Sequence, residues 1–325
     1  MRRWGSAAVI VAVLMAGATR WWLVAVDGPG PLPEPRAILV PHGGRSQLAE
    51  MLASEGIVAG PRTFWLAALL TRGEGTLHAA EFAFPAHASV REVLTILRTA
   101  HPVEHHLTIA EGLTGQQIRG VLARAEALIG DAPPIPEGSV LPQTYDYQYG
   151  AERAHIVERA QAAMDKDLAA AWADRAAGLP LTSPREALIL ASIVERETAK
   201  PEERPHVAAV YLNRLRLGMK LQADPTVAYE ASGGSGVLDR RLTRADLERA
   251  DPFNTYRSAG LPPGPICSPG LESLHAVLHP AASDDLYFVA DGTGGHAFSR
   301  TLEAHDNAVA RWRALVPSAP HGSPD

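Results

Sequence analysis

The sequence is poor in cysteine and has no excess of basic residues, and both shortages exclude classes of protein. Its 325 residues include one cysteine, Cys267, which can form neither an internal disulfide nor a cysteine-based zinc cage. The 30 lysines and arginines are outnumbered by 36 aspartates and glutamates, and a net charge of -6 argues against nucleic acid as the main ligand. With 46% hydrophobic and 20% charged residues, the chain has the composition of a globular protein whose length suits two domains.

Long apolar runs are also scarce, and the main one lies at the N-terminus. Two arginines precede a mostly apolar stretch that Arg20 interrupts near its end. About 22 residues are available, enough to cover the hydrocarbon core of a bilayer, with Arg20 reaching the far interface. We therefore expect a cytoplasmic tail over residues 1–3, a single transmembrane anchor over 4–26 and an exported body. A signal peptide cleaved near residues 16–18 is the alternative, and it would export the same body.

Beyond this segment, the chain is expected to be α+β, with a small α/β subdomain followed by a larger helix-rich domain. Ser89 and Glu92 form a Ser-x-x-Glu capping box that predicts the start of a helix in the small subdomain. Near the C-terminus, residues 286–290 and 296–299 read as the two strands of a hairpin. The expected parts are a Pro-rich linker over 27–36, the small subdomain over 37–102, the larger domain over 103–316 and a disordered tail over 317–325.

One segment carries the strongest helix signals in the chain. Ser183 is placed to cap the helix, Pro184 takes its first position, and Glu186 stands where it would close a capping box. When the helix is projected at about 100° per residue, Glu197 falls near the centre of the apolar stripe and Glu195 falls outside it. The stripe consists of Ala187, Leu190, Ile193 and Val194.

Glu197 is therefore a carboxylic acid on the core side of an apolar helix. Burial disfavours the charged form, so the pKa of Glu197 should be raised. Such an acid can protonate a glycosidic oxygen near neutral pH, which makes Glu197 the candidate catalytic residue. The alternative is a structural Glu197 paired with a buried arginine such as Arg214.

Polar side chains on stiff loops are the candidates for binding a ligand. Gln222, Asp224, Asn254 and Tyr256 lie in segments rich in proline, glycine and amide groups, which suits an extended polar ligand such as a glycan. Each also has a structural alternative: Asp224 can cap a turn before a proline, and Asn254 can cap a helix.

Two further patterns point to no site. Three histidines at 101, 105 and 106 have no carboxylate or further histidine at convincing ligand spacing, so a solvated loop is favoured over a metal site. The glycines at 292, 294 and 295 have no Lys-Ser/Thr and no suitable helix after them, which excludes a phosphate loop. We expect no metal and no cofactor.

Several short motifs occur in order along the chain: Ala191 to Thr198, Glu203-Arg204-Pro205, Asn213-Arg214-Leu215, Leu221-Gln222, Asp224-Pro225-Thr226, Asn254-Thr255-Tyr256, residues 260–264 and residues 287–292. Together they resemble the endolytic murein transglycosylases, the YceG-like family. The motifs Glu111-Gly112 and Glu137-Gly138 are similar to the family as well. Two positions depart from its pattern: Gln143 stands where the family usually has aspartate, and Ala223 where it usually has threonine.

The resemblance implies a location, a fold and a reaction. It implies a single-pass protein of the bacterial inner membrane, with a LysM-like subdomain ahead of a periplasmic catalytic domain. It implies internal cleavage of nascent peptidoglycan strands between N-acetylmuramic acid and N-acetylglucosamine, giving 1,6-anhydro ends and terminating the strands that peptidoglycan synthases elongate. The family's catalytic acid, the second glutamate of Glu-x-Glu-Thr, falls on Glu197, the residue that the helical projection also selects.

Two rival functions remain open. One is an inactive, membrane-tethered scaffold that binds glycan through the small subdomain. The other is a muramidase that uses water, which would leave a reducing end instead of an anhydro end. An acid on the apolar face of its helix disfavours the scaffold.

Overall fold

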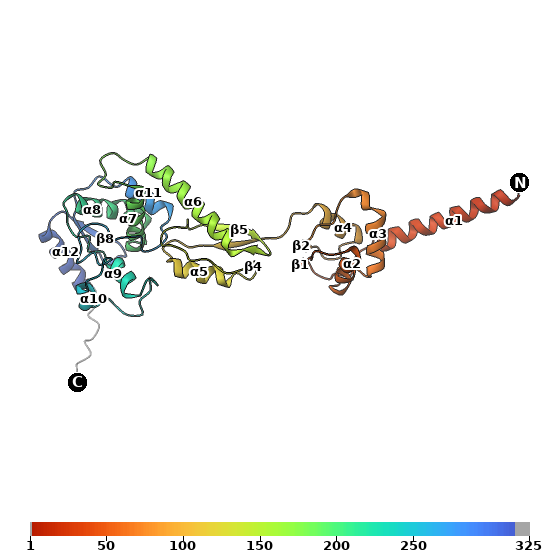
Figure 1. The fold of residues 1–325 in the computed structure, drawn as a ribbon, viewed down its shortest axis with the longest axis horizontal. Helices are drawn as coiled ribbons and strands as arrows, with labels where there is room; N and C mark the ends of the chain where they lie inside the picture. The colour runs from red at the N-terminus through yellow and green to blue at the C-terminus, as the bar shows by residue number, and fades with distance from the viewer. Residues whose placement is uncertain (1, 316–325) are drawn as a thin grey trace, which may run out of the picture. The chain divides into compact units, whose positions relative to one another are not determined.

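The computed structural model describes residues 2–315 as a helix-rich α+β protein in which every sheet has two strands (Figure 1). The α+β class expected from the sequence is confirmed. The tail predicted over 317–325 lies outside the described residues. The chain divides into two compact units: residues 2–105 with 146–151, and residues 106–145 with 152–315.

Helix α1 (Arg2–Ala25) occupies the segment in which the membrane anchor was expected. Arg20 breaks its apolar run, and Trp22 near its end packs with Val26 against the core of the N-terminal unit. Within the part of the chain that the structure describes, no helix combines the length and the apolarity that crossing a membrane requires. The anchor predicted over 4–26 is therefore not confirmed.

The N-terminal unit is built around one antiparallel strand pair. Strand β1 pairs with β2 so that Arg36 lies opposite Phe84 and Leu39 opposite Glu81. Phe82 and Phe84 alternate along β2 and are buried, as expected for a strand with one face on a core. The LysM-like character expected of this unit stays a prediction. Its elements are β1 (Arg36–Leu39), α2 (Arg45–Ser54), α3 (Pro61–Leu70), the short 3-10 helix η1 (Arg72–Glu74), β2 (Glu81–Phe84) and α4 (Val90–Thr99).

Helix α4 begins at the capping box that the sequence predicts. The Ser89 hydroxyl accepts from the Glu92 N–H (3.2 Å), and the Ser89 N–H donates to Glu92 Oε2 (2.8 Å). These bonds satisfy two backbone donors at the helix start. The helix then buries Val93 and Leu97 in the core of the unit.

The C-terminal unit is dominated by helices. Strand β3 pairs with β5 and strand β4 with β6, and β3, β5 and β6 each run across the boundary between the two units. The predicted hairpin is confirmed as β7 and β8, which pair with Phe288 opposite Phe298 and Ala290 opposite His296. The remaining elements, in chain order, are β3 (Glu104–Thr108), α5 (Gly115–Arg124), β4 (Leu128–Ile129), β5 (Thr144–Gln148), β6 (Ala151–Glu152), α6 (Arg153–Ala173), α7 (Pro184–Glu197), η2 (Pro201–Glu203), α8 (Arg204–Arg216), α9 (Asp224–Ala231), α10 (Arg244–Glu248), α11 (Leu271–Leu278), β7 (Tyr287–Ala290), β8 (His296–Ser299) and α12 (Leu302–Leu315).

Helix α7 is the central helix of this unit and contacts α6, α8, α9 and α11. It begins as predicted, because the Ser183 hydroxyl accepts from the Glu186 N–H (3.3 Å). The predicted capping box is not closed, since the Glu186 carboxylate instead accepts from the Thr182 N–H (2.6 Å) and hydroxyl (2.9 Å). Every residue from Ala187 to Val194 is buried, so the helix has no solvent face along this length.

Replacing Leu97 by alanine should destabilise the N-terminal unit by about 2–5 kcal/mol, because it removes a buried side chain and leaves a cavity. Urea denaturation of the full chain measures this loss. Leu70→Ala is the matched control, because Leu70 lies in the same unit with 63% of its surface exposed. Its effect should stay within about 0.5 kcal/mol. Equal losses in the two variants would contradict the described core.

Candidate active site

Glu197 is the last residue of α7, where the helix emerges from the core. Its Oε2 accepts a hydrogen bond from the Tyr211 hydroxyl on α8 (2.9 Å). The alternative of a structural ion pair with Arg214 is not formed among the described residues: the Arg214 guanidinium donates to the backbone oxygens of Leu286 (2.7 Å) and Leu221 (2.6 Å). The carboxyl group is thus held by one hydroxyl, with no counter-ion in contact.

A cavity of about 190 Å³ opens beside the Glu197 carboxyl group. Helices α7, α8 and α9 and the β7–β8 hairpin, which Figure 1 shows in the C-terminal unit, all contribute to its walls. Most of the residues that line this cavity are polar. The lining consists of Glu197, Arg214, Leu221, Gln222, Asp224, Tyr256, Phe288, Val289, Ala290 and His296.

The environment of Glu197 favours its protonated form. Burial raises the pKa of Glu197 to about 7, and the negative charge of Asp224 acts in the same direction. The hydrogen bond from Tyr211 and the positive charge of Arg214 lower the pKa without cancelling the effect of burial. Near neutral pH the group can therefore exist as acid or as carboxylate, which suits a residue that both gives and takes a proton.

Glu195, two residues earlier, has a different surrounding. Its buried carboxylate accepts from Arg204 (3.3 Å) and from the Gly270 N–H (3.0 Å). Arg204 also lies 3.6 Å from Glu111, so the two carboxylates share one guanidinium. Glu195 is thus tied into the structure, and it does not line the cavity.

Three of the four predicted substrate-binding residues line the cavity with Glu197. Asp224 and Gln222 are exposed there, and the Tyr256 hydroxyl donates to Asp224 Oδ1 (2.6 Å). Gln222 has a φ of +52°, unusual for a residue with a side chain, and its N–H donates to the Thr255 carbonyl oxygen (3.1 Å). The backbone contact with Thr255 therefore helps to hold Gln222 in a strained turn, as is common at functional sites.

The fourth, Asn254, lies outside the cavity and is fully buried. Its amide nitrogen donates to the backbone oxygens of Asp246 (3.2 Å), Leu247 (3.1 Å) and Arg249 (2.8 Å). Its side-chain oxygen accepts from the Tyr256 N–H (3.0 Å). Asn254 thus ties the preceding segment to the backbone that carries Tyr256.

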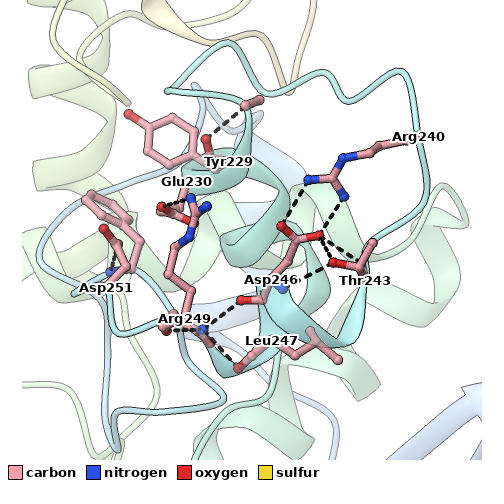
Figure 2. Close-up of polar contacts among 11 residues, drawn as sticks. Tyr229, Glu230, Arg240, Thr243, Asp246, Leu247, Arg249 and Asp251 are labelled. Carbon is pink, nitrogen blue, oxygen red and sulfur yellow. Dashed lines mark hydrogen bonds and ion pairs between the residues drawn. The ribbon is translucent and has the colours of Figure 1, made fainter.

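Figure 2 shows how the segment before Asn254 is held. The Asp246 carboxylate accepts from Arg240 (2.6 Å) and from the Thr243 hydroxyl (2.7 Å). Arg249 donates to Glu230 on α9 (3.0 Å). The segment between α9 and Tyr256 is therefore held in place by charge-assisted hydrogen bonds as well as by the bonds of Asn254.

Sequence reasoning missed two polar residues of the site: Tyr211, which is buried and bonded to Glu197, and His296, which lines the cavity. Tyr211 precedes Arg214 by three positions on α8, so helical spacing from that arginine could have indicated it. His296 begins β8, and its Nδ1 lies 2.7 Å from Glu203 Oε2 while its N–H donates to Oε1 (3.1 Å). A Cβ on the preceding Gly295 would collide with the same carboxylate. No sequence signal links Glu203 to a histidine so far along the chain.

The ring of His296 is oriented by this contact. An ionised Glu203 accepts the Nδ1 proton, and interactions with His296 lower the pKa of Glu203 despite its partial burial. Nε2 makes no hydrogen bond within the described part of the chain, so it is the nitrogen left for a ligand in the cavity.

A second carboxyl group also has a raised pKa but lies elsewhere. Burial raises the pKa of Glu137 to about 7, against hydrogen bonds from the Gly115 N–H (3.0 Å) and the Tyr229 hydroxyl. Glu137 does not line the cavity of Glu197. A raised pKa alone therefore does not define the site, whereas a raised pKa beside the polar cavity does.

Several other residues that the sequence singled out do not line the cavity. Gln143 is exposed near the start of β5 and is not among the lining residues. Ala223 is buried, and its N–H donates to the Thr255 hydroxyl (2.9 Å). His105 lies 2.5 Å from Glu81, and no three His, Cys, Asp or Glu side chains among residues 2–315 are grouped to hold a metal.

The chain matches the YceG-like family over residues 38–311 and belongs to that family. It is 41% identical over 130 residues to the endolytic murein transglycosylase of Bacillus subtilis, covering 40% of this chain and 35% of that protein. It is 34% identical over 181 residues to the protein of that name from Streptococcus pneumoniae, covering 54% of this chain and 32% of the other. The chain thus spans about a third of the length of these relatives. A YceG-like protein from Listeria monocytogenes, solved at 2.6 Å, matches with a TM-score of 0.54 and 26% identity over 84% of this chain and 98% of that one.

Glu197→Gln should make stability less dependent on pH. Because the pKa of Glu197 in the folded protein is about 7 and its ordinary value is 4.5, the wild type loses free energy of unfolding as pH rises through this window. The variant cannot ionise there, so it should gain stability relative to the wild type between about pH 5 and about pH 8. Urea denaturation at the two pH values measures the gain.

Glu195→Gln is the matched variant for this measurement. It weakens a bond to the buried guanidinium of Arg204, so it should lower the free energy of unfolding at both pH values. A Glu197→Gln variant whose difference from the wild type is the same at both pH values would contradict the raised pKa.

Proposed function

We propose that the protein is an endolytic lytic transglycosylase that cleaves the β-1,4 bond between N-acetylmuramic acid and N-acetylglucosamine in peptidoglycan. The observation that carries the proposal is a protonatable Glu197 beside a polar cavity. Family membership and the names of the relatives support the same reaction class. Because peptidoglycan lies outside the cytoplasmic membrane, the catalytic unit would act on the outer side of that membrane. We also propose that the protein is anchored in the inner membrane with its N-terminus inside.

In the first step, protonated Glu197 gives its proton to the glycosidic oxygen as the bond to the anomeric carbon breaks. The Tyr211 hydroxyl occupies Oε2, which leaves Oε1 for the substrate. The sugar develops oxocarbenium character, and the carboxylate that forms stabilises this charge. The N-acetylglucosamine side leaves as an alcohol.

In the second step, the Glu197 carboxylate takes the proton of the muramyl 6-hydroxyl group. The oxygen then closes on the anomeric carbon and gives a 1,6-anhydro end, which restores the protonated acid. Tyr211 stabilises the carboxylate between the steps by donating its hydrogen bond. One carboxyl group serves both steps, so the paired carboxylates of hydrolases are not required.

The other polar groups of the cavity are proposed to position the sugar. Gln222, Asp224 and Tyr256 contribute one wall, and His296 contributes Nε2 from the β7–β8 hairpin. Asn254 is assigned a supporting role, because its bond to the Tyr256 backbone holds that wall in place. Strand termination beside peptidoglycan synthases would follow from cutting nascent strands internally.

The reaction is tested with the full chain and uncrosslinked glycan strands, because Val26 and Trp22 belong to the core of the N-terminal unit, and the products are read by mass spectrometry. The wild type should release anhydro-ended fragments, and Glu197→Gln should reduce the rate by at least about a hundredfold. Glu137→Gln is the matched control, since Glu137 has a similarly raised pKa outside the cavity, and it should remain active. Reducing ends would indicate a hydrolase, and no fragments from any variant would favour a glycan-binding scaffold.

His296→Gln should lower kcat/KM about three- to tenfold, mainly through KM, because one hydrogen bond to the sugar is lost. His206→Gln is the matched control. His206 also contacts a carboxylate, Asp285 (2.8 Å), and stacks on Phe298, but it does not line the cavity. Steady-state kinetics on soluble strands separates the two, and equal losses would contradict a role for His296 in positioning.

A further inference from the structure

A second cavity, of about 330 Å³, lies within the N-terminal unit and has a basic lining. No aspartate or glutamate lines it, although the chain as a whole carries a net charge of -6. The lining also contains no aromatic side chain and no asparagine or glutamine, the groups that usually bind sugars. Its charged and titratable members are His42, Arg45, Arg72, His78 and Arg98.

One wall of this cavity is a strand, a glycine-containing loop and a helix in sequence. Strand β1 leads through His42, Gly43 and Gly44 into α2, a helix of 10 residues. The Gly44 N–H donates to Gln47 Oε1 (3.2 Å), whereas among the described residues no side chain accepts from the N–H groups of the first turn, residues 45–47. These free donors and the helix dipole attract negative charge.

Arg98 is the buried arginine of the lining, and its guanidinium is already bonded within the unit. Its side chain is only 4% exposed, and its guanidinium donates to Glu74 (2.8 Å) and to the Thr71 carbonyl (2.9 Å) and hydroxyl (2.8 Å). Its Nε is buried and has no partner in the described part of the chain. Glu74 lies outside the lining but offsets the charge of Arg98, so Arg45 and Arg72 are the arginines of the lining that have no ion pair among the described residues.

We infer that this cavity binds a phosphate group, presented as a diphosphate or as a phosphate ester. Arginine matches the paired oxygens of phosphate, and helix N-termini with glycine loops bind the same group. The site is separate from the cavity of Glu197 and does not depend on the reaction proposed there. The same chemistry could come from a soluble diphosphate or from a phospholipid headgroup.

The test is isothermal titration of the full chain with inorganic diphosphate and with glycerophosphoglycerol, a soluble phospholipid headgroup. The wild type should bind at least one of them saturably. Arg45→Ala and Arg72→Ala should each weaken binding about tenfold, the value of one charge-assisted hydrogen bond. Arg62→Ala, an exposed arginine of α3 outside the cavity, is the matched control and should bind like the wild type.

Tighter binding of diphosphate would support a diphosphate ligand, and tighter binding of the headgroup would support a lipid source. Both results support the site, provided that the Arg45→Ala and Arg72→Ala variants lose affinity. Absence of saturable binding to the wild type would overturn the inference. Equal weakening in Arg62→Ala would overturn it as well, because net charge alone would then explain the binding.

Discussion

The structure of the C-terminal unit depends on one constraint: a carboxyl group is placed where it loses water but gains no counter-ion. Helix α7 is buried on every side until its last turn, so Glu197 emerges at the edge of the core. The Tyr211 hydroxyl gives it a hydrogen bond without a charge. Arg214, the nearby cation, donates from Nε and Nη1 to backbone oxygens, and its positive charge lowers the pKa of Glu197 without an ion pair among the described residues.

The groups on the two sides of Glu197 have different roles. On one side, the Glu195 carboxylate and Arg204 form a buried ionic anchor that ties the end of α7 to the Gly270 backbone. On the other, Asp224 and Tyr256 form a polar wall whose backbone is held by buried amide and hydroxyl groups. The ionic anchor stabilises the fold on the core side of Glu197, and the polar groups lie on its cavity side. Two glutamates separated by a single residue, Glu195 and Glu197, thus have different roles.

Local signals in the sequence carried much of the prediction. The start of α7, the Ser89–Glu92 box and the β7–β8 hairpin depend on neighbours a few residues away, which periodicity and capping rules describe. The one-sided stripe expected of α7 is not observed, because every residue from Ala187 to Val194 is buried. The role of Asn254 and the Glu203–His296 pair depend on contacts that only the folded chain creates. The anchor over 4–26 was predicted from the length of an apolar run. Arg20 interrupts that run, and the end of the helix packs against the core of the N-terminal unit.

Gly295 shows how far the requirements of the cavity extend. Its backbone is not strained, and it touches no group of the proposed reaction. Any side chain there would occupy the space of the Glu203 carboxylate that orients His296. A side chain at this position would therefore have to displace the Glu203 carboxylate and the Lys200 ammonium, and the orientation of His296 would change with them.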